Sequence, residues 1–115
     1  MTQLADVEER ERRILDVLLA LREGEVTTYG DVADTAGYPK LSRLVGRILA
    51  TTDVEVPWWR VVTASGRLVP GHEAEQAQRL RAEAVQVRSG RVVRAERGRF
   101  SRADPLGSPR PSRSP

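Results

Sequence analysis

The chain has 115 residues, enough for one compact domain, and contains no cysteine and a single histidine, His72. Disulfides, thiolate metal sites and thiol nucleophiles are therefore excluded, and we expect neither a metal ion nor a cofactor. The formal charge of +3 is unevenly distributed, because residues 86–115 hold eight arginines against two acidic residues, a net +6, which leaves residues 1–85 at −3. Net charge alone therefore does not predict a polyanionic partner; only a local basic patch could.

The beginning of the chain is acidic rather than an apolar run behind a basic start, so it does not read as a signal peptide. No stretch of the sequence reaches the length of a membrane span. We expect a cytoplasmic, monomeric protein that does not enter a membrane.

The first half of the chain predicts three helices. Residues 8–21 are amphipathic, with apolar residues at helical spacing, and Gly24 ends this helix. Thr28 is a good N-cap for a short helix over residues 29–36, and Gly37 fits its C-cap. Pro39 suits the first turn of a further helix that extends to about residue 50. A short helix, a tight turn and a second helix form a helix-turn-helix pattern.

The second half predicts short strands around one helix. Residues 57–62 are strand-like, and a Ser-Gly turn leads to a second extended segment at 67–69. Residues 73–84 predict a helix, and Ser89-Gly90 predicts the turn of another hairpin. The fold class we predict is mainly α with small β-hairpins, a winged helix-turn-helix-like DNA-binding domain over residues 1–96. Arg, Ser, Pro and Gly dominate residues 97–115, which we expect to form a disordered tail.

The predicted helix from Pro39 carries a basic face. Lys40, Arg43 and Arg47 recur at i, i+3 and i+7, and Ser42 and Gly46 form a small, flat strip beside them. Glycine costs about 1 kcal/mol in a helix relative to alanine, so Gly46 needs a reason, and the close approach of another backbone is one. A slim helix flanked by basic residues fits the minor groove of duplex DNA. The alternative is a solvated face, with Gly46 packed against the first helix.

Three motifs occur in order: Thr-Thr-Tyr-Gly-Asp-Val-Ala at 27–33, Ser-Arg-Leu-Val-Gly at 42–46 and Pro-Trp-Trp-Arg-Val-Val at 57–62. Together they resemble the DNA-binding domain of the O6-alkylguanine-DNA alkyltransferase family. The corresponding family segments are Thr-Tyr-Gly-acid-Ile/Val-Ala, an Arg-Ala-Val-Gly type and Pro-Cys-His-Arg-Val. The resemblance covers roughly residues 8–93, and three motifs in order with similar spacing are more specific than any one of them.

The resemblance implies how duplex DNA would be bound. Tyr29 stands where the family's tyrosine pushes on a phosphate to rotate a nucleotide out of the duplex. Arg43 stands where an arginine fills the vacated place in the stack. Flipping costs a few kcal/mol, and a planar guanidinium in the gap offsets part of this cost. The residues expected to contact DNA are Tyr29, Lys40, Ser42, Arg43, Gly46, Arg47 and Arg60.

The main departure from the family is chemical. Trp58 occupies the place of the nucleophilic cysteine, and the chain holds no other thiol. Indole is not a thiolate-like nucleophile, so alkyl transfer is excluded and we expect no catalytic residue. A subgroup of the family, the alkyltransferase-like proteins, carries tryptophan at this place. Those proteins bind alkylated guanine without repairing it and flag it for nucleotide excision repair, which the resemblance implies for this chain too.

A second departure concerns the base pocket, whose expected residues are Trp58 and Trp59. Trp59 replaces the family's histidine, and packing in a strand is the simpler role for it. Glu83 matches the glutamate of the family's Cys-His-Glu relay, and without those partners we expect it to be structural. The pocket loop at 68–72 is about two residues shorter than in the family.

Two other functions remain open. One is a transcription-factor-like helix-turn-helix protein that reads DNA without flipping, and Tyr29 together with Arg43 argues against it. The other is a degenerate family member that acts as a protein-interaction module, and a retained basic face would separate both DNA-binding functions from it.

Overall fold

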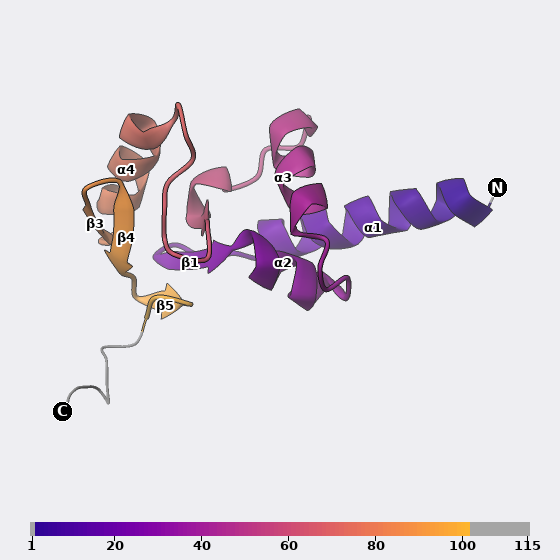
Figure 1. Cartoon of the computed structure of the whole chain (residues 1–115), viewed down its shortest axis with the longest axis horizontal. Helices are drawn as coiled ribbons and strands as arrows, with labels where there is room; N and C mark the ends of the chain where they lie inside the picture. Colours follow the sequence, from indigo (N-terminus) through magenta and orange to yellow (C-terminus); the bar gives the residue numbers. More distant parts are fainter. Residues whose placement is uncertain (1, 102–115) are drawn as a thin grey trace.

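Four α-helices, five short strands and one 3-10 turn make up residues 2–101, the part of the chain that this computed structural model describes (Figure 1). In chain order the elements are α1 (Thr2–Leu19), β1 (Glu25–Thr28), α2 (Tyr29–Ala36), α3 (Ser42–Thr51), η1 (Trp58–Arg60), β2 (Val61–Val62), α4 (Glu73–Ala82), β3 (Gln86–Arg88), β4 (Arg91–Arg94) and β5 (Arg97–Gly98). None of these helices is long and apolar enough to cross a membrane.

The helix-turn-helix prediction is confirmed by α2 and α3. The Thr28 hydroxyl accepts a hydrogen bond from the Asp31 N–H at 3.1 Å, which caps α2. Gly37, at φ 95°, ends the helix in the left-handed conformation and donates its N–H to carbonyls of the last turn. Helix α1 packs against both α2 and α3 (Figure 1). The first core between the three helices buries Ile14, Leu18, Val32, Ala33, Ala36, Val45 and Ile48, closed by Val56 and Val61.

The third helix starts later than predicted. Pro39 lies in the turn before α3. Lys40 adopts a left-handed backbone conformation with φ 76°, which is incompatible with a right-handed helix at this residue. Lys40 is exposed but does not continue the helical row of Arg43 and Arg47. The predicted i, i+3, i+7 basic face is therefore reduced to two residues on α3.

A three-stranded sheet runs through the middle of the domain in the order β2-β1-β5, with both pairings parallel. The prediction of a strand over 57–62 is wrong for its first part, because the Arg60 N–H bonds the Pro57 carbonyl and curls the chain into η1. Only Val61 and Val62 form a strand. Their side chains point to opposite sides, Val61 into the first core and Val62 into a second one.

The second core lies between the sheet, α4 and the β3–β4 hairpin. It buries Val26, Val62, Leu68, Ala77, Leu80, Val85, Val92 and Ala95. The predicted hairpin is confirmed, because β3 and β4 pair antiparallel across Ser89 and Gly90, whose φ angles are 54° and 74°. The predicted turn at Ser65-Gly66 is present, since the Thr63 N–H bonds the Arg67 carbonyl at 3.1 Å, but the segment after the turn does not pair with β2, and residue 67 forms a single bridge to Arg91 of β4.

The folded domain extends beyond the predicted boundary at residue 96. Strand β5 pairs with β1, and Arg99 donates two hydrogen bonds to the Asp31 carboxylate at 2.8 and 2.6 Å. Phe100 packs against the second core. Residues 97–101 are thus held by partners that are distant in sequence, and the rest of the predicted tail, 102–115, lies outside the described residues.

Candidate nucleic-acid interface

A cavity of about 460 Å³ opens beside α3, between this helix and the loop that leads into α4. It is lined by Tyr29, Gly46, Leu49, Ala50, Trp58, Val69, His72 and Glu75. The three motifs that the sequence singled out therefore meet at one place, since each contributes at least one of these residues. We call this space the α3 cavity.

One face of α3 forms a wall of the α3 cavity and carries Arg43 at its edge. Gly46, Leu49 and Ala50 line the cavity. Leu49 and Ala50 follow Gly46 by three and four residues, so both share a helical face with it. Ser42 and Arg43 precede Gly46 by four and three residues and lie one turn along the same face. Arg43 is exposed and takes part in no ion pair among residues 7–101, whose side chains the structure describes. Its guanidinium is thus free to enter DNA placed against this face.

Tyr29 packs against Gly46. Its ring carbons lie 3.9 and 4.0 Å from the position that a Cβ at residue 46 would take, an ordinary van der Waals contact. Burial raises the pKa of the Tyr29 hydroxyl above its usual value, so at neutral pH the phenol is protonated and can donate a hydrogen bond to a phosphate. The packing reason expected for Gly46 thus lies in Tyr29 and the cavity, and not in the first helix.

Gly46→Ala is expected to stabilise the protein and weaken DNA binding. The added methyl meets no clash and removes a glycine from a helix, so the free energy of unfolding should rise by about 1 kcal/mol. The same methyl projects at the cavity wall, and we expect affinity for a lesion-containing duplex to fall roughly tenfold. Gly30→Ala in α2, where a Cβ meets nothing within 4 Å, controls for helix propensity. Denaturation and DNA titration measure the two effects, and a variant that binds as wild type would contradict the assignment of this face.

Two aromatic rings form the far wall of the cavity. The Trp58 ring lies 5.9 Å from the His72 ring at an interplanar angle of 66°, an edge-on arrangement. Trp58 also meets Trp59 edge-on, at 6.2 Å and 88°. Trp58 is therefore held by packing on two sides while one side lies in the cavity, where an indole can contact a base but offers no nucleophile.

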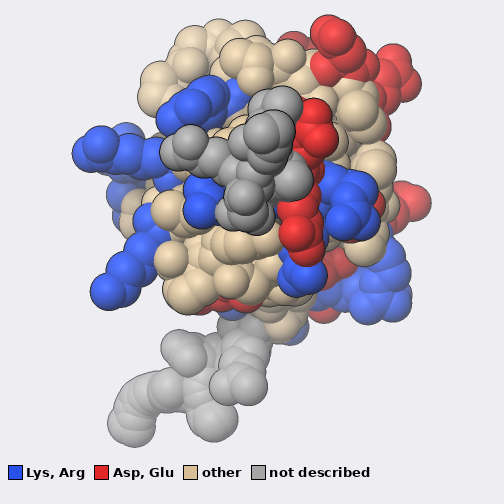
Figure 2. All heavy atoms as spheres, turned by 90° about the vertical axis from the view of Figure 1, so that its right-hand side faces the viewer, with Lys and Arg blue, Asp and Glu red and all other residues tan. Residues whose placement is uncertain are grey.

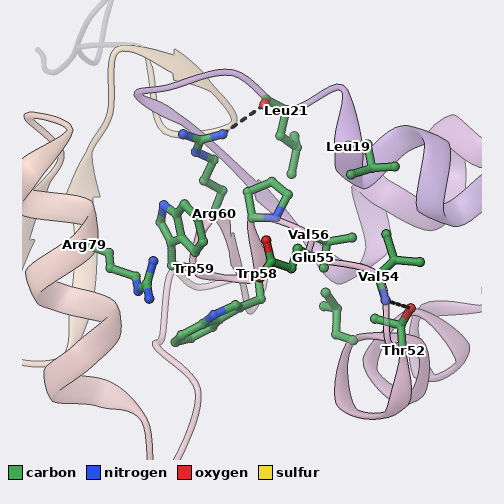
Figure 3. A pocket seen from close by; sticks show the side chains of 12 residues that line it. Leu19, Leu21, Thr52, Val54, Glu55, Val56, Trp58, Trp59, Arg60 and Arg79 are labelled. Carbon is green, nitrogen blue, oxygen red and sulfur yellow. Dashed lines mark hydrogen bonds between the residues drawn. The ribbon is translucent and has the colours of Figure 1, made fainter.

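Trp59 and Arg60, which were predicted to bind the base and a phosphate, do not line the α3 cavity, and both are bonded to Glu83 instead. The Glu83 carboxylate accepts hydrogen bonds from Trp59 Nε1 at 2.9 Å, from Arg60 Nε at 3.0 Å and from Arg60 Nη2 at 2.7 Å. It also accepts the Gly24 N–H at 2.9 Å, while Arg60 Nη1 donates to the Leu21 carbonyl at 3.0 Å (Figure 3). Three of the five N–H donors of the Arg60 guanidinium are thus bonded inside the protein, and its side chain is only 14% exposed, which leaves little of it for a phosphate.

The same junction explains the structural role of Glu83. Burial acts to raise the pKa of this carboxyl, but the hydrogen bonds from Arg60, Gly24 and Trp59 outweigh burial and hold the pKa below its ordinary value. The Arg60 and Glu83 side chains are only 14% and 11% exposed. Glu83 is therefore an ionised, largely buried acceptor that joins three segments, as expected for a structural residue.

A second cavity, of about 560 Å³, lies on the other side of Trp58 (Figure 3). Apolar side chains from the end of α1 and from the loop after α3 line it, together with Trp58, Trp59, Arg60 and Arg79. Trp59 stands between Arg60 and Arg79, whose guanidinium carbons lie 5.2 and 4.6 Å from its ring centre. Leu49 and Trp58 line both cavities, but neither Tyr29 nor any residue of the first two turns of α3 lines this second one.

Gln76 is a residue that the sequence interpretation missed. It is fully buried, and its amide donates to the Trp59 and Val61 carbonyls, both at 3.1 Å, and accepts the Val69 N–H at 2.7 Å. It therefore ties the loop of the α3 cavity to the segment that carries Trp58. The only sequence signal was its place four residues before Leu80, on the inward face of α4.

Exposed basic side chains occur on α3 and elsewhere on the surface. Figure 2 shows Lys and Arg on both the left and the right of this view, with acidic side chains at the upper right and between them. Arg43, Arg47 and Lys40 are all exposed, and Ser42 is partly buried beside them. A helix-turn-helix with exposed arginines on its second helix and a cavity beside it defines a DNA-binding domain that has room for an extruded base.

Comparison with known proteins identifies the family. Residues 9–85 match the family model described as 6-O-methylguanine DNA methyltransferase, DNA binding domain. The chain therefore belongs to this family. The match spans α2, α3, Trp58 and Glu83, and so includes nearly all of the elements that form the α3 cavity and the Glu83 junction.

Similar proteins come from bacteria and yeast. The DNA base-flipping protein of Escherichia coli strain K12 is 37% identical over 94 residues, which cover 78% of this chain and 73% of that protein. Alkyltransferase-like protein 1 of Schizosaccharomyces pombe is 31% identical over 81 residues, 65% of this chain and 75% of that protein.

Solved structures of the family superpose on this fold. S. pombe Atl1 in complex with damaged DNA containing O6-carboxymethylguanine has a TM-score of 0.63 at 29% identity, covering 70% of this chain and 81% of that one. Mycobacterium tuberculosis OGT in complex with DNA has a TM-score of 0.57 at 32% identity, covering 64% and 48%.

Proposed function

We propose that this protein is a non-enzymatic sensor of alkylated guanine in double-stranded DNA. The observation that carries the proposal is the α3 cavity, which lies beside the helix-turn-helix and has Trp58 where an alkyl acceptor would need a cysteine. In this function Tyr29 and Arg43 extrude the nucleotide, and the cavity receives its base. The similarity to a DNA base-flipping protein and to Atl1 bound to damaged DNA supports it.

The geometry of α3 supports an approach through the minor groove. Gly46 leaves no side chain in the middle of the α3 face that also forms the cavity wall. A minor groove about 6 Å wide admits a helix only when the groove opens and the helix is slim. Arg47 and Lys40 are exposed beside this face and would contact phosphates, while Arg60 is withdrawn from that role.

Binding without repair needs a later step, and recruitment of nucleotide excision repair proteins is the one we propose. In this scheme the protein acts in the cytoplasm as a monomer, and the complex with DNA is itself the signal. A cavity of this volume favours flipping over a helix-turn-helix protein that reads DNA from outside, because a plain reader has no use for it.

A titration with two duplexes, identical except for one O6-methylguanine, tests the proposal. We expect tighter binding to the damaged duplex, by tenfold or more, because only that duplex presents an alkylated base to the cavity. In parallel, incubation with DNA that carries a labelled methyl group should leave no covalent label on the protein, since the chain has no thiol. Equal affinity for the two duplexes, or stable labelling of the protein, would contradict the proposed function.

A further inference from the structure

Three arginines form a row across β3, β4 and the extended segment at residue 67 that bridges to β4. Arg88 and Arg91 are cross-strand partners on either side of the β3–β4 turn. Arg91 also faces Arg67 through an antiparallel bridge, so β4 lies in the middle of the row. Side chains at directly opposed positions project from the same face of a sheet, and all three residues are exposed. We call this set the arginine row.

The arginine row is electrostatically unfavourable within the protein itself. The Leu68 N–H bonds the Gly90 carbonyl and the Val92 N–H bonds the Gly66 carbonyl. Arg67 and Arg91 lie between these two hydrogen bonds and form a non-hydrogen-bonded pair, a type in which the two Cα atoms are about 4.5 Å apart. Like charges at directly opposed positions destabilise a sheet.

No counter-charge relieves this repulsion in the part of the chain that the structure describes. The four ion pairs among the described side chains, those of residues 7–101, involve other arginines. No hydrogen bond from the side chains of the arginine row to these residues is present either, whereas Arg81, Arg97 and Arg99 each have such a partner. Among residues 7–101, neither an ion pair nor a side-chain hydrogen bond offsets the repulsion within the row, which indicates a role outside folding.

The row lies next to the α3 cavity. Leu68 is buried in the second core at 4% exposure, and side chains along an extended segment alternate, so Arg67 and Val69 point away from that core. Val69 lines the α3 cavity. The row thus starts two residues from the cavity wall and leads outward across strands spaced about 4.8 Å apart. Its guanidinium groups can reach successive phosphates of a strand that passes the cavity.

We propose that the arginine row of Arg67, Arg91 and Arg88 is a second DNA-contacting surface, which binds the sugar-phosphate backbone beside the flipped nucleotide. This inference rests on the proposed function, because the use of the α3 cavity for a base brings the DNA to this side. A phosphate backbone fits better than an acidic protein segment, because it presents evenly spaced anions along a line and guanidinium groups bind phosphate oxygens in pairs.

The test compares full-length wild type with a variant that carries Arg67→Gln, Arg88→Gln and Arg91→Gln. Glutamine keeps the Cβ and Cγ methylenes, which matters because Arg91 Cγ lies against Gly66, 3.2 Å from where a Cβ at that residue would be. Affinities for damaged and undamaged duplexes are measured over a range of salt concentrations. Each lost phosphate contact lowers the slope of log K against log salt by about 0.9, so we expect a reduction of about two to three in the triple variant.

Two further measurements make the result specific. The ratio of affinities for damaged and undamaged DNA should stay at the wild-type value, since phosphate contacts carry no information about the base. Arg91→Gln alone should lower the slope by about one, while Arg12→Gln, which removes an exposed charge from α1, should leave it unchanged. Relief of like-charge repulsion should also leave the triple variant at least as stable as wild type.

If the slope of log K against log salt is unchanged in the triple variant, the proposal is wrong. A clearly lower free energy of unfolding in that variant would also overturn it, because the arginine row would then be structural. Failure of the proposed function gives a different result. Wild type would then bind both duplexes equally, while the slope on undamaged DNA would still report on the arginine row.

Discussion

Replacing Glu83 with glutamine is expected to lower the free energy of unfolding by roughly 3 kcal/mol, because it leaves the buried Arg60 guanidinium without its counter-charge. The Glu83 carboxylate accepts four hydrogen bonds, from Gly24, Trp59 and Arg60. It thereby joins the end of α4 to η1 and to the loop before β1. Domains of this size are stable by only about 5–15 kcal/mol in total, so such a loss is a large fraction.

Chemical denaturation followed by tryptophan fluorescence measures this effect. The chain has two tryptophans, and the Trp59 indole is itself bonded to Glu83, so the signal reports on the junction. Glu9→Gln is the matched control, because Glu9 forms an exposed ion pair with Arg13 and such pairs contribute about 0–1 kcal/mol. Equal losses in the two variants would show that the Glu83 junction does not hold the domain together.

The Glu83 junction also predicts a dependence on pH. The folded-state pKa of Glu83 lies below its ordinary value of 4.5, so ionised Glu83 stabilises the fold above that pH. This stabilisation is lost as the pH falls through the folded-state pKa. We therefore expect wild type to lose stability on acidification more steeply than Glu83→Gln. The pKa of Asp31 is also lowered, chiefly by its hydrogen bond from Arg99, but it contributes to both proteins, so their difference isolates Glu83.

Arg43→Lys is expected to remove most of the preference for damaged DNA, tenfold or more, while affinity for undamaged DNA stays close to wild type. Lysine keeps a positive charge for a phosphate but lacks the planar group that can stack in the place of an extruded base. Arg43→Ala should weaken binding to both duplexes. Arg47→Lys, one turn further along α3 and equally exposed, is the control, and we expect it to bind both duplexes like wild type.

Tyr29→Ala should show the same selective loss as Arg43→Lys, because both residues act on the extrusion step. Placing 2-aminopurine at the target position measures this step directly, since unstacking raises its emission. The model of extrusion fails if wild type binds without any change in emission and Arg43→Lys behaves like wild type on both duplexes. A helix-turn-helix protein that reads DNA without flipping would then be the better description.

Features that depend on neighbouring residues could be predicted from the sequence. Thr28 and Gly37 bound α2 as expected, and Ser89-Gly90 forms the predicted hairpin turn, because caps and tight turns are set by local hydrogen bonds and backbone angles. The absence of cysteine excluded thiol chemistry without any structure. The order of the three motifs indicated the family, since it needs only residue types and spacing.

Features that depend on distant partners were decided by the tertiary structure alone. The sequence predicted that Arg60 contacts a phosphate, but in the fold it binds Glu83, which lies 23 residues away. Trp59 also donates a hydrogen bond to Glu83 and does not line the α3 cavity. Residues 97–101 are too polar to predict a strand, yet β1 supplies a pairing edge for them. Whether a charged side chain faces solvent or the interior is determined by which other segment packs beside it, and a one-dimensional pattern does not contain that information.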